Sequence, residues 1–168
     1  GARGTPAFDR IRAEIAERLM REEGFSALVG EADWPDAYRV QRYVQGRGSD
    51  ADASLALGGF KRFPQWMWRN ADVLEFVGWL RNHNDALPVR RKVGFYGLDL
   101  YSLHASMEAG LSYLSVVDPE AALKAKKRFP CFDQFGDNPQ SSVYDTSAGL
   151  APSCAPQVTV WPRERDRL

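Results

Sequence analysis

Two short apolar segments, each followed by an acidic residue, constrain the fold of this chain most strongly. The first covers residues 25–29 and is followed by Glu31, and the second covers residues 93–98 and is followed by Asp99. A short apolar run beside a glycine is typical of a strand that is buried on both faces of a parallel sheet. The sequence therefore predicts two buried strands with Glu31 and Asp99 at equivalent ends.

Helical patterns precede, separate and follow these two segments. Thr5 and Pro6 are typical of a helix start, an apolar face follows, and Gly24 ends the helix. Apolar spacing and capping residues predict further helices around residues 38–43, 51–57, 71–80 and 103–114, and another that begins at Asp118. The order helix, strand, helices, strand, helices predicts an α/β fold, with a central parallel sheet that is flanked by helices and incomplete in this chain.

Charge and cysteine usage limit the classes of partner. Twenty-two basic and twenty-two acidic side chains cancel, so we expect no nucleic acid and no membrane partner. No apolar run approaches the roughly 20 residues that a membrane-spanning helix requires. Cys131 and Cys154 lie in unrelated contexts and form neither a metal-binding spacing nor a disulfide framework, so the expected location is the reducing cytoplasm.

Four polar residues are candidates for chemistry. Because ligand sites gather at the carboxyl ends of parallel strands, we expect Glu31 and Asp99 to share one cleft, although an ion pair with an arginine is an alternative for either acid. Arg12, on the first helix, has a guanidinium that can hold a carboxylate or an oxyanion, but most helix arginines are solvated. His104 follows the second strand, and a hydrogen-bonded core histidine is the alternative that we favour for it.

The chain also contains an aromatic cluster, and it lacks several motifs that are typical of catalytic or binding sites. The cluster can line a pocket for a bulky apolar substrate, but core packing is the interpretation that we favour. Its members are Phe60, Phe63, Trp66 and Trp68. The chain has no Gly-x-Ser-x-Gly elbow, no phosphate-binding loop and no His-Glu-x-x-His pair, so we predict neither a cofactor nor a metal.

Three longer blocks of sequence together resemble the erythromycin esterase family. They are Glu31-Ala32-Asp33-Trp34-Pro35-Asp36-Ala37-Tyr38-Arg39-Val40, the block at residues 58–70 and the block at residues 94–104. The blocks occur in family order, and the likeness runs from about residue 4 to about residue 140. The resemblance implies that residues 1–140 are the N-terminal part of a domain of this family, and that residues 141–168 form an irregular, aberrant tail.

The resemblance also implies an activity. Family members use a histidine as a general base on water to hydrolyse a carboxylic ester, with acids and an arginine in support. By position, Arg12 matches the arginine of the helix after that histidine, and Glu31 matches the acid at the strand end. We therefore assign catalytic roles to Glu31 and Arg12. We assign substrate binding to Asp99, His104 and Trp34.

Two departures from the family pattern change this expectation. Arg3 stands where the family has its histidine, and a guanidinium has no acceptor for a proton. Family members also continue through a second half that carries later histidines. We therefore expect a fragment of an ester hydrolase that is inactive as given, whose parent acts on a small-molecule ester or macrolide lactone. The alternative is a non-catalytic remnant or ligand-binding fragment.

Overall fold

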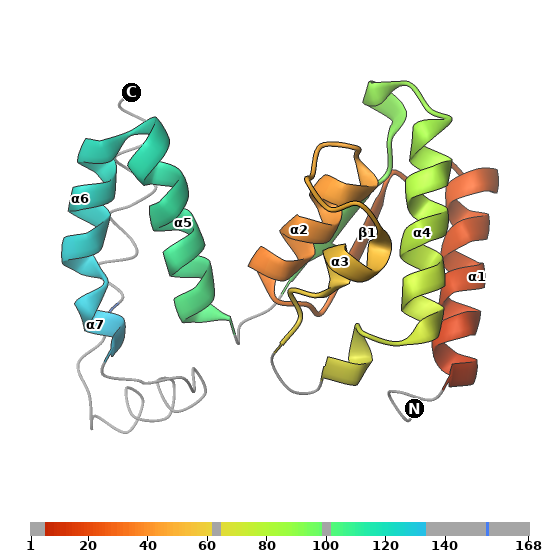
Figure 1. Cartoon of the computed structure of the whole chain (residues 1–168), viewed down its shortest axis with the longest axis horizontal. Helices are drawn as coiled ribbons and strands as arrows, with labels where there is room; N and C mark the ends of the chain where they lie inside the picture. Colours follow the sequence, from red (N-terminus) through yellow and green to blue (C-terminus); the bar gives the residue numbers. More distant parts are fainter. Residues whose placement is uncertain (1–5, 62–64, 99–101, 134–153, 155–168) are drawn as a thin grey trace. The chain divides into compact units, whose positions relative to one another are not determined.

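The chain folds into two compact units, residues 1–99 and residues 100–168. The computed structural model describes residues 6–61, 65–98, 102–133 and 154. The first unit (Figure 1) contains, in order, α1 (Pro6–Glu22), β1 (Ala27–Gly30), α2 (Trp34–Val44), α3 (Ala53–Leu57), η1 (Gln65–Met67), α4 (Ala71–Asp85), η2 (Val89–Arg91) and β2 (Gly94–Gly97). The second unit contains α5 (Leu103–Val117), α6 (Pro119–Arg128) and α7 (Pro130–Asp133).

The two strands form a parallel sheet, as the order of elements predicted. β1 pairs with β2 in a register that runs from Ala27 opposite Gly94 to Gly30 opposite Gly97. The helix α2 packs along β2, and α1 lies beside α4 (Figure 1). The described chain is thus mostly helical around a small parallel sheet, which confirms the α/β prediction.

The prediction that both strands are buried on both faces is wrong. Alternate side chains of a strand point to opposite faces of a sheet. Phe95 is buried and its register partner Leu28 is half-buried, whereas Val29 and its partner Tyr96 are 53% and 48% exposed. One face of the strand pair therefore packs against the core and the other is open, a difference that an unbroken apolar run does not reveal.

A buried asparagine ties the core of the first unit together. The core consists of apolar side chains from α1 to β2, of which the largest fully buried ones are Phe95, Leu80, Val40, Val44 and Val77. Asn84, on α4, is 0% exposed. Its Nδ2 donates to the carbonyl oxygens of Val44 and Val93 at 2.9 Å each, and its Oδ1 accepts from the Val93 amide at 2.7 Å. The end of α2 is thereby fixed to the start of β2.

The helix α1 forms where the sequence predicts it, but its apolar face is exposed. Ile11 and Ile15, which carry the periodic pattern, are 50% and 54% exposed. Met20 is buried instead, with Ala13 and Ala16 packed against the core. Gly24 follows the helix with φ of 69°, a conformation that glycine adopts readily. Periodicity thus identified the helix without identifying the face that meets the core.

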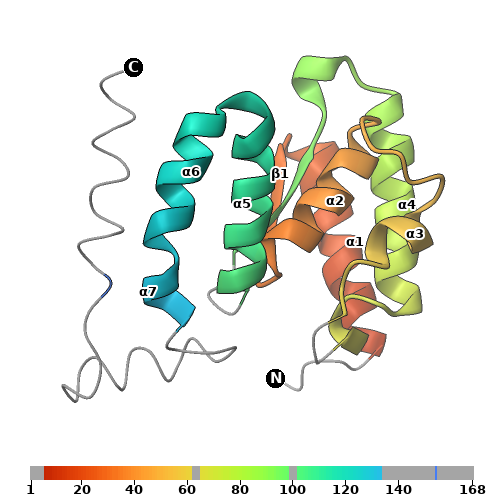
Figure 2. The same ribbon diagram turned by 60° about the vertical axis from the view of Figure 1, so that its left-hand side comes forward.

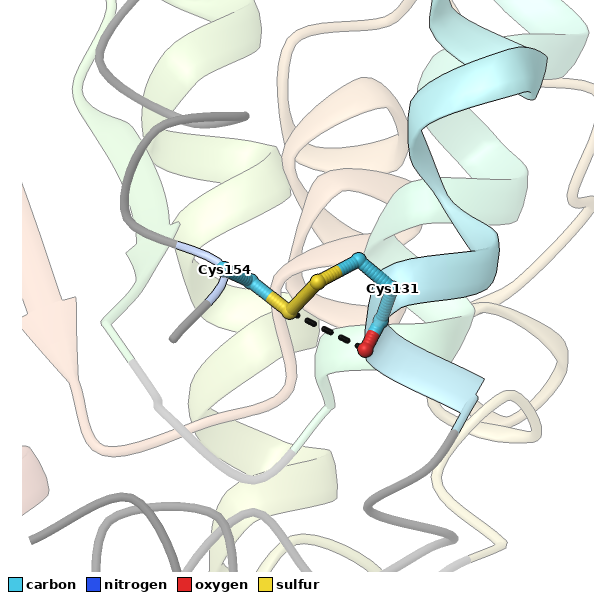
Figure 3. Close-up of a disulfide and its surroundings, with 2 residues drawn as sticks. All are labelled: Cys131 and Cys154. Carbon is cyan, nitrogen blue, oxygen red and sulfur yellow. Dashed lines mark hydrogen bonds between the residues drawn. A yellow bond between two sulfur atoms is a disulfide. The ribbon is translucent and has the colours of Figure 1, made fainter. Parts of the chain in front are cut away.

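The second unit is a set of helices closed by a disulfide. α5 and α6 lie side by side (Figure 2), and Asp118 caps α6 as predicted by accepting from the Ala121 amide at 3.0 Å. A disulfide joins Cys131 on α7 to Cys154, with Cα atoms 5.9 Å apart (Figure 3). The two cysteines are therefore partners, although their sequence contexts did not indicate it. Of the predicted tail at residues 141–168, Cys154 alone lies within the described residues.

In the described ranges, no helix has both the length and the apolar character that crossing a membrane requires.

Candidate functional site

A cavity of about 310 Å³ opens in the first unit where α1, the end of β1, η1 and α4 meet. Its wall is mainly apolar, with a few charged groups. The lining residues are Asp9, Arg12, Ala13, Ala16, Leu28, Val29, Gly30, Glu31, Met67, Trp68, Asp72, Val73, Phe76 and Phe95. Apolar walls with a small number of charged groups are typical of sites for small organic ligands.

Both residues that the sequence proposed as catalytic line this cavity. Arg12 comes from the middle of α1, and Glu31 follows the last residue of β1. They are 19 positions apart in the sequence, and the fold of the first unit brings both into the lining of one cavity. The placement of Glu31 at the carboxyl end of a parallel strand is the one that α/β sheets commonly use for ligand sites.

An ion pair and two hydrogen bonds connect Arg12 to the start of α4. Arg12 Nη1 lies 3.4 Å from Asp9 Oδ1, and the Asp9 side chain is only 12% exposed. The other oxygen of Asp9 accepts from Asn70 Nδ2 at 3.2 Å. Asn70 in turn caps α4, because its Oδ1 accepts from the Val73 amide at 2.9 Å. These contacts link the start of α4 to α1, while the Arg12 side chain itself is 61% exposed.

Trp68 forms much of the apolar wall. Its ring stacks on Phe60 with centroids 5.4 Å apart and meets the edge of Phe95 at 5.9 Å. The backbone of Gly30 lies so close that an added Cβ would stand 2.6 Å from Cη2 of Trp68. Of the aromatic cluster in the sequence, Trp68 therefore both packs in the core and lines the cavity, whereas Phe63 lies outside the described residues.

Of the residues proposed for substrate binding, Trp34 alone lies within the described part of the first unit. Trp34 begins α2, is 44% exposed and stacks on Tyr38 at 5.7 Å, and it is not part of the lining. His104 is a half-buried residue in the first turn of α5, in the second unit. Asp99 lies outside the described residues, so its predicted cleft with Glu31 stays a prediction.

Two acids of the lining were missed by reasoning from the sequence. Asp9 lies three positions before Arg12 on the same helix, a spacing that brings side chains together, and this was the signal that could have found it. Asp72 lies in the first turn of α4 after the capping Asn70, where an acid is explained by the helix dipole alone. Its position in the cavity wall depends on how α4 packs against α1, which no local pattern encodes.

A comparison with known protein families shows which family the chain is related to. A family model described as erythromycin esterase matches residues 20–165. The chain belongs to the erythromycin esterase family. No solved structure matches it. The region matched to the erythromycin esterase family includes Glu31, Trp34, Asp99 and His104, and it also covers most of the segment from residue 141 to 168. Arg12 precedes the matched region, so its role rests on the cavity and on the resemblance around it.

Proposed function

We propose that the cavity in the first unit is the ester-binding part of a carboxylic ester hydrolase site. The observation that carries the proposal is the convergence of Arg12 and Glu31, from α1 and from the end of β1, on one cavity with an aromatic wall. A guanidinium and a carboxylate beside an apolar surface suit an ester, whose carbonyl oxygen becomes negative when water attacks it. A macrolide lactone is the specific substrate class that family membership suggests.

The roles of the two residues follow from the chemistry of hydrolysis. Water adds to the ester carbonyl as a base removes its proton, and the resulting tetrahedral oxyanion collapses to a carboxylate and an alcohol. Arg12 stabilises the oxyanion through its N–H groups, while Asp9 and Asn70 position the guanidinium. Glu31 accepts a hydrogen bond from the attacking water and orients it.

Binding without turnover is the behaviour that we expect from this chain. Among the described residues that line the cavity, none is a histidine. Arg3 stands at the position of the general base in the family resemblance, and a guanidinium does not accept a proton at ordinary pH. These two observations favour the second candidate function, a ligand-binding chain that does not hydrolyse its ligand.

An assay of hydrolysis with a macrolide and with a simple aryl ester distinguishes an active hydrolase from a chain that only binds its ligand. We expect no turnover by the chain or by Arg3→His, because the family site also uses later histidines. Binding of the ester should be weakened in Arg12→Ala and Glu31→Ala. Turnover by the unaltered chain that disappears in Glu31→Ala would establish an active hydrolase. If the unaltered chain, Arg12→Ala and Glu31→Ala bound the ester equally well, the cavity would be excluded as the ester-binding site.

The disulfide bears on the cellular location of the protein. Disulfides persist in oxidising compartments and are rare in the cytosol. The bond between Cys131 and Cys154 therefore argues against the cytoplasmic location that the isolated cysteines had favoured.

A further inference from the structure

The apolar part of the cavity wall combines aromatic rings with small side chains. The rings are those of Trp68, Phe76 and Phe95, which come from the segment after η1, from α4 and from β2. The two apolar residues that α1 contributes to the described lining are both alanines, Ala13 and Ala16. A larger side chain at either position would take up part of the cavity, so the alanines keep it open.

Neighbouring groups hold the indole of Trp68 in place. Phe60 stacks on it, the ring of Phe95 meets it edge-on, and the backbone of Gly30 lies against it. A side chain that is packed on several sides does not move aside for a ligand without a loss of those contacts. Trp68 therefore gives the cavity a fixed aromatic wall.

The volume of the cavity limits the size of the ligand that it can enclose. The cavity measures about 310 Å³, whereas small-molecule sites range from about 300 to 1,000 Å³. A cavity of about 150 Å³ is enough for benzene. The space therefore fits a single aromatic ring with a short ester group, and it is too small to enclose a macrolide lactone.

We propose that the cavity selects esters of small aromatic acids over aliphatic esters of the same size and over macrolide lactones, and that Trp68 determines this selection. The inference rests on the proposed function, because it takes the same cavity as the ester site. The aromatic ring of the ligand lies against Trp68 and Phe76, since contacts between aromatic rings are more favourable than the buried area alone would give. The attached ester group reaches Arg12 and Glu31, which line the same cavity.

Three esters test the selection on the full chain. Methyl benzoate and methyl cyclohexanecarboxylate have the same carbon skeleton and differ in the aromaticity of the ring, and erythromycin is the large lactone. Binding is measured by NMR titration of the backbone amides. We expect methyl benzoate to bind about threefold to tenfold more tightly than the cyclohexane ester. We expect erythromycin to leave the amides of Gly30 and Val73 unshifted.

Two pairs of variants locate the source of the selection. Trp68→Leu should bind the two methyl esters about equally, whereas Trp66→Leu, at a 45% exposed position outside the cavity lining, should keep the preference. Ala13→Leu should weaken the binding of methyl benzoate by about tenfold, because it fills part of the cavity. Ala7→Leu, at an exposed position of the same helix, should not. Thermal melts confirm that each variant is folded, and the three esters on the unaltered chain decide the selection if a variant does not fold.

The outcomes separate this inference from the proposed function. Equal or tighter binding of the cyclohexane ester, an unchanged preference in Trp68→Leu, or saturable shifts of the Gly30 and Val73 amides with erythromycin would overturn the inference. If such unselective binding were weakened in Arg12→Ala and Glu31→Ala, the proposed ester site would stand without it. A preference for methyl benzoate that is unchanged in those two variants would leave the selection standing and exclude the proposed roles of Arg12 and Glu31. If no ester bound, both would be overturned.

Discussion

Gly30 and Trp68 lie in such close contact that an added Cβ on Gly30 would be 2.6 Å from Cη2 of the indole. Gly30 is the last residue of β1, and Trp68 follows η1, so the contact joins the strand end to the connection that precedes α4. Both residues line the cavity. The absence of a side chain at residue 30 thus lets the indole form the wall next to Glu31.

Gly30→Ala should therefore displace Trp68. Real Cβ atoms almost never approach another atom so closely, and the rigid indole has little room between Phe60 and Phe95. We expect a loss of about 1 to 3 kcal/mol in the free energy of unfolding, measured by chemical denaturation. The cavity should also bind an aryl ester more weakly.

Gly78→Ala is the matched control for this change. Gly78 lies within α4, and nothing stands within 4 Å of a Cβ placed there. Alanine is favoured over glycine in a helix by roughly 0.5 to 1 kcal/mol, so this variant should be as stable as the unaltered chain or more stable. Equal stability of the Gly30 and Gly78 variants would contradict the close contact.

Asn84→Leu should destabilise the first unit severely. Leucine fills a similar volume but leaves the Val93 amide and the Val44 carbonyl without the hydrogen bonds that Asn84 provides. The Val93 carbonyl keeps a hydrogen bond from Gln45 Nε2. Such buried, unpaired groups are expected to cost about 2 to 4 kcal/mol in total. Denaturant unfolding measures this loss. Asn82→Ala, at an exposed position of the same helix, should change the stability little, and a similar loss in both variants would count against the buried network.

His83 makes the stability of the first unit depend on pH. Burial, and then the nearby Arg21 guanidinium, lower the pKa of His83 below its ordinary value of 6.5. His83 stacks on Trp79 at 5.0 Å, and Arg21 also lies over that indole at 5.0 Å. The unfolded chain therefore binds a proton at a higher pH than the folded chain does.

The free energy of unfolding should then fall as pH drops below about 6.5, until His83 is also protonated in the folded state. His83→Gln should reduce this fall, because glutamine does not titrate in this range. Unfolding curves of the two proteins between about pH 5 and pH 8 test the prediction. A profile that is unchanged in His83→Gln would show that other groups cause the dependence.

Reduction of the disulfide should loosen the second unit alone. A crosslink that closes a loop of this length is worth about 3 kcal/mol. In the double variant Cys131→Ser, Cys154→Ser, amide hydrogen exchange should become faster in α5, α6 and α7. Exchange in α2 and α4 should be unchanged, because they belong to the other compact unit. Unaltered exchange in α5, α6 and α7 would indicate that the disulfide does not support them.

The sequence predicted the elements of the fold better than their environment. Asn70 caps α4 and Asp118 caps α6 at the helix starts that the sequence predicts, because capping depends on residues three positions apart. The exposure of Val29 and of Ile11 was not predictable in the same way. Each depends on which neighbouring elements pack against a strand or a helix, and an apolar pattern records only that one side is apolar.

The site was predicted in part for the same reason. Arg12 and Glu31 were proposed from their matches to a family and from the position of Glu31 at a strand end, and they line one cavity. Trp34 was proposed from the same family-like block as Glu31, yet it is exposed on α2 and outside that cavity. Glu31 and Trp34 diverge because residues 31–33 connect β1 to α2, and Trp34 is already the first, exposed residue of that helix.

The most direct measurement of the central claim is an NMR titration of the chain, carrying ¹⁵N-labelled tryptophan, with an aryl ester. Trp68 lines the cavity that holds Arg12 and Glu31, whereas Trp34 and Trp66 do not. We expect the indole resonance of Trp68 to shift in a saturable way, and we expect the shift to be lost or to need much more ester in Glu31→Ala. A saturable shift of Trp34 or Trp66 with Trp68 unmoved would contradict that claim.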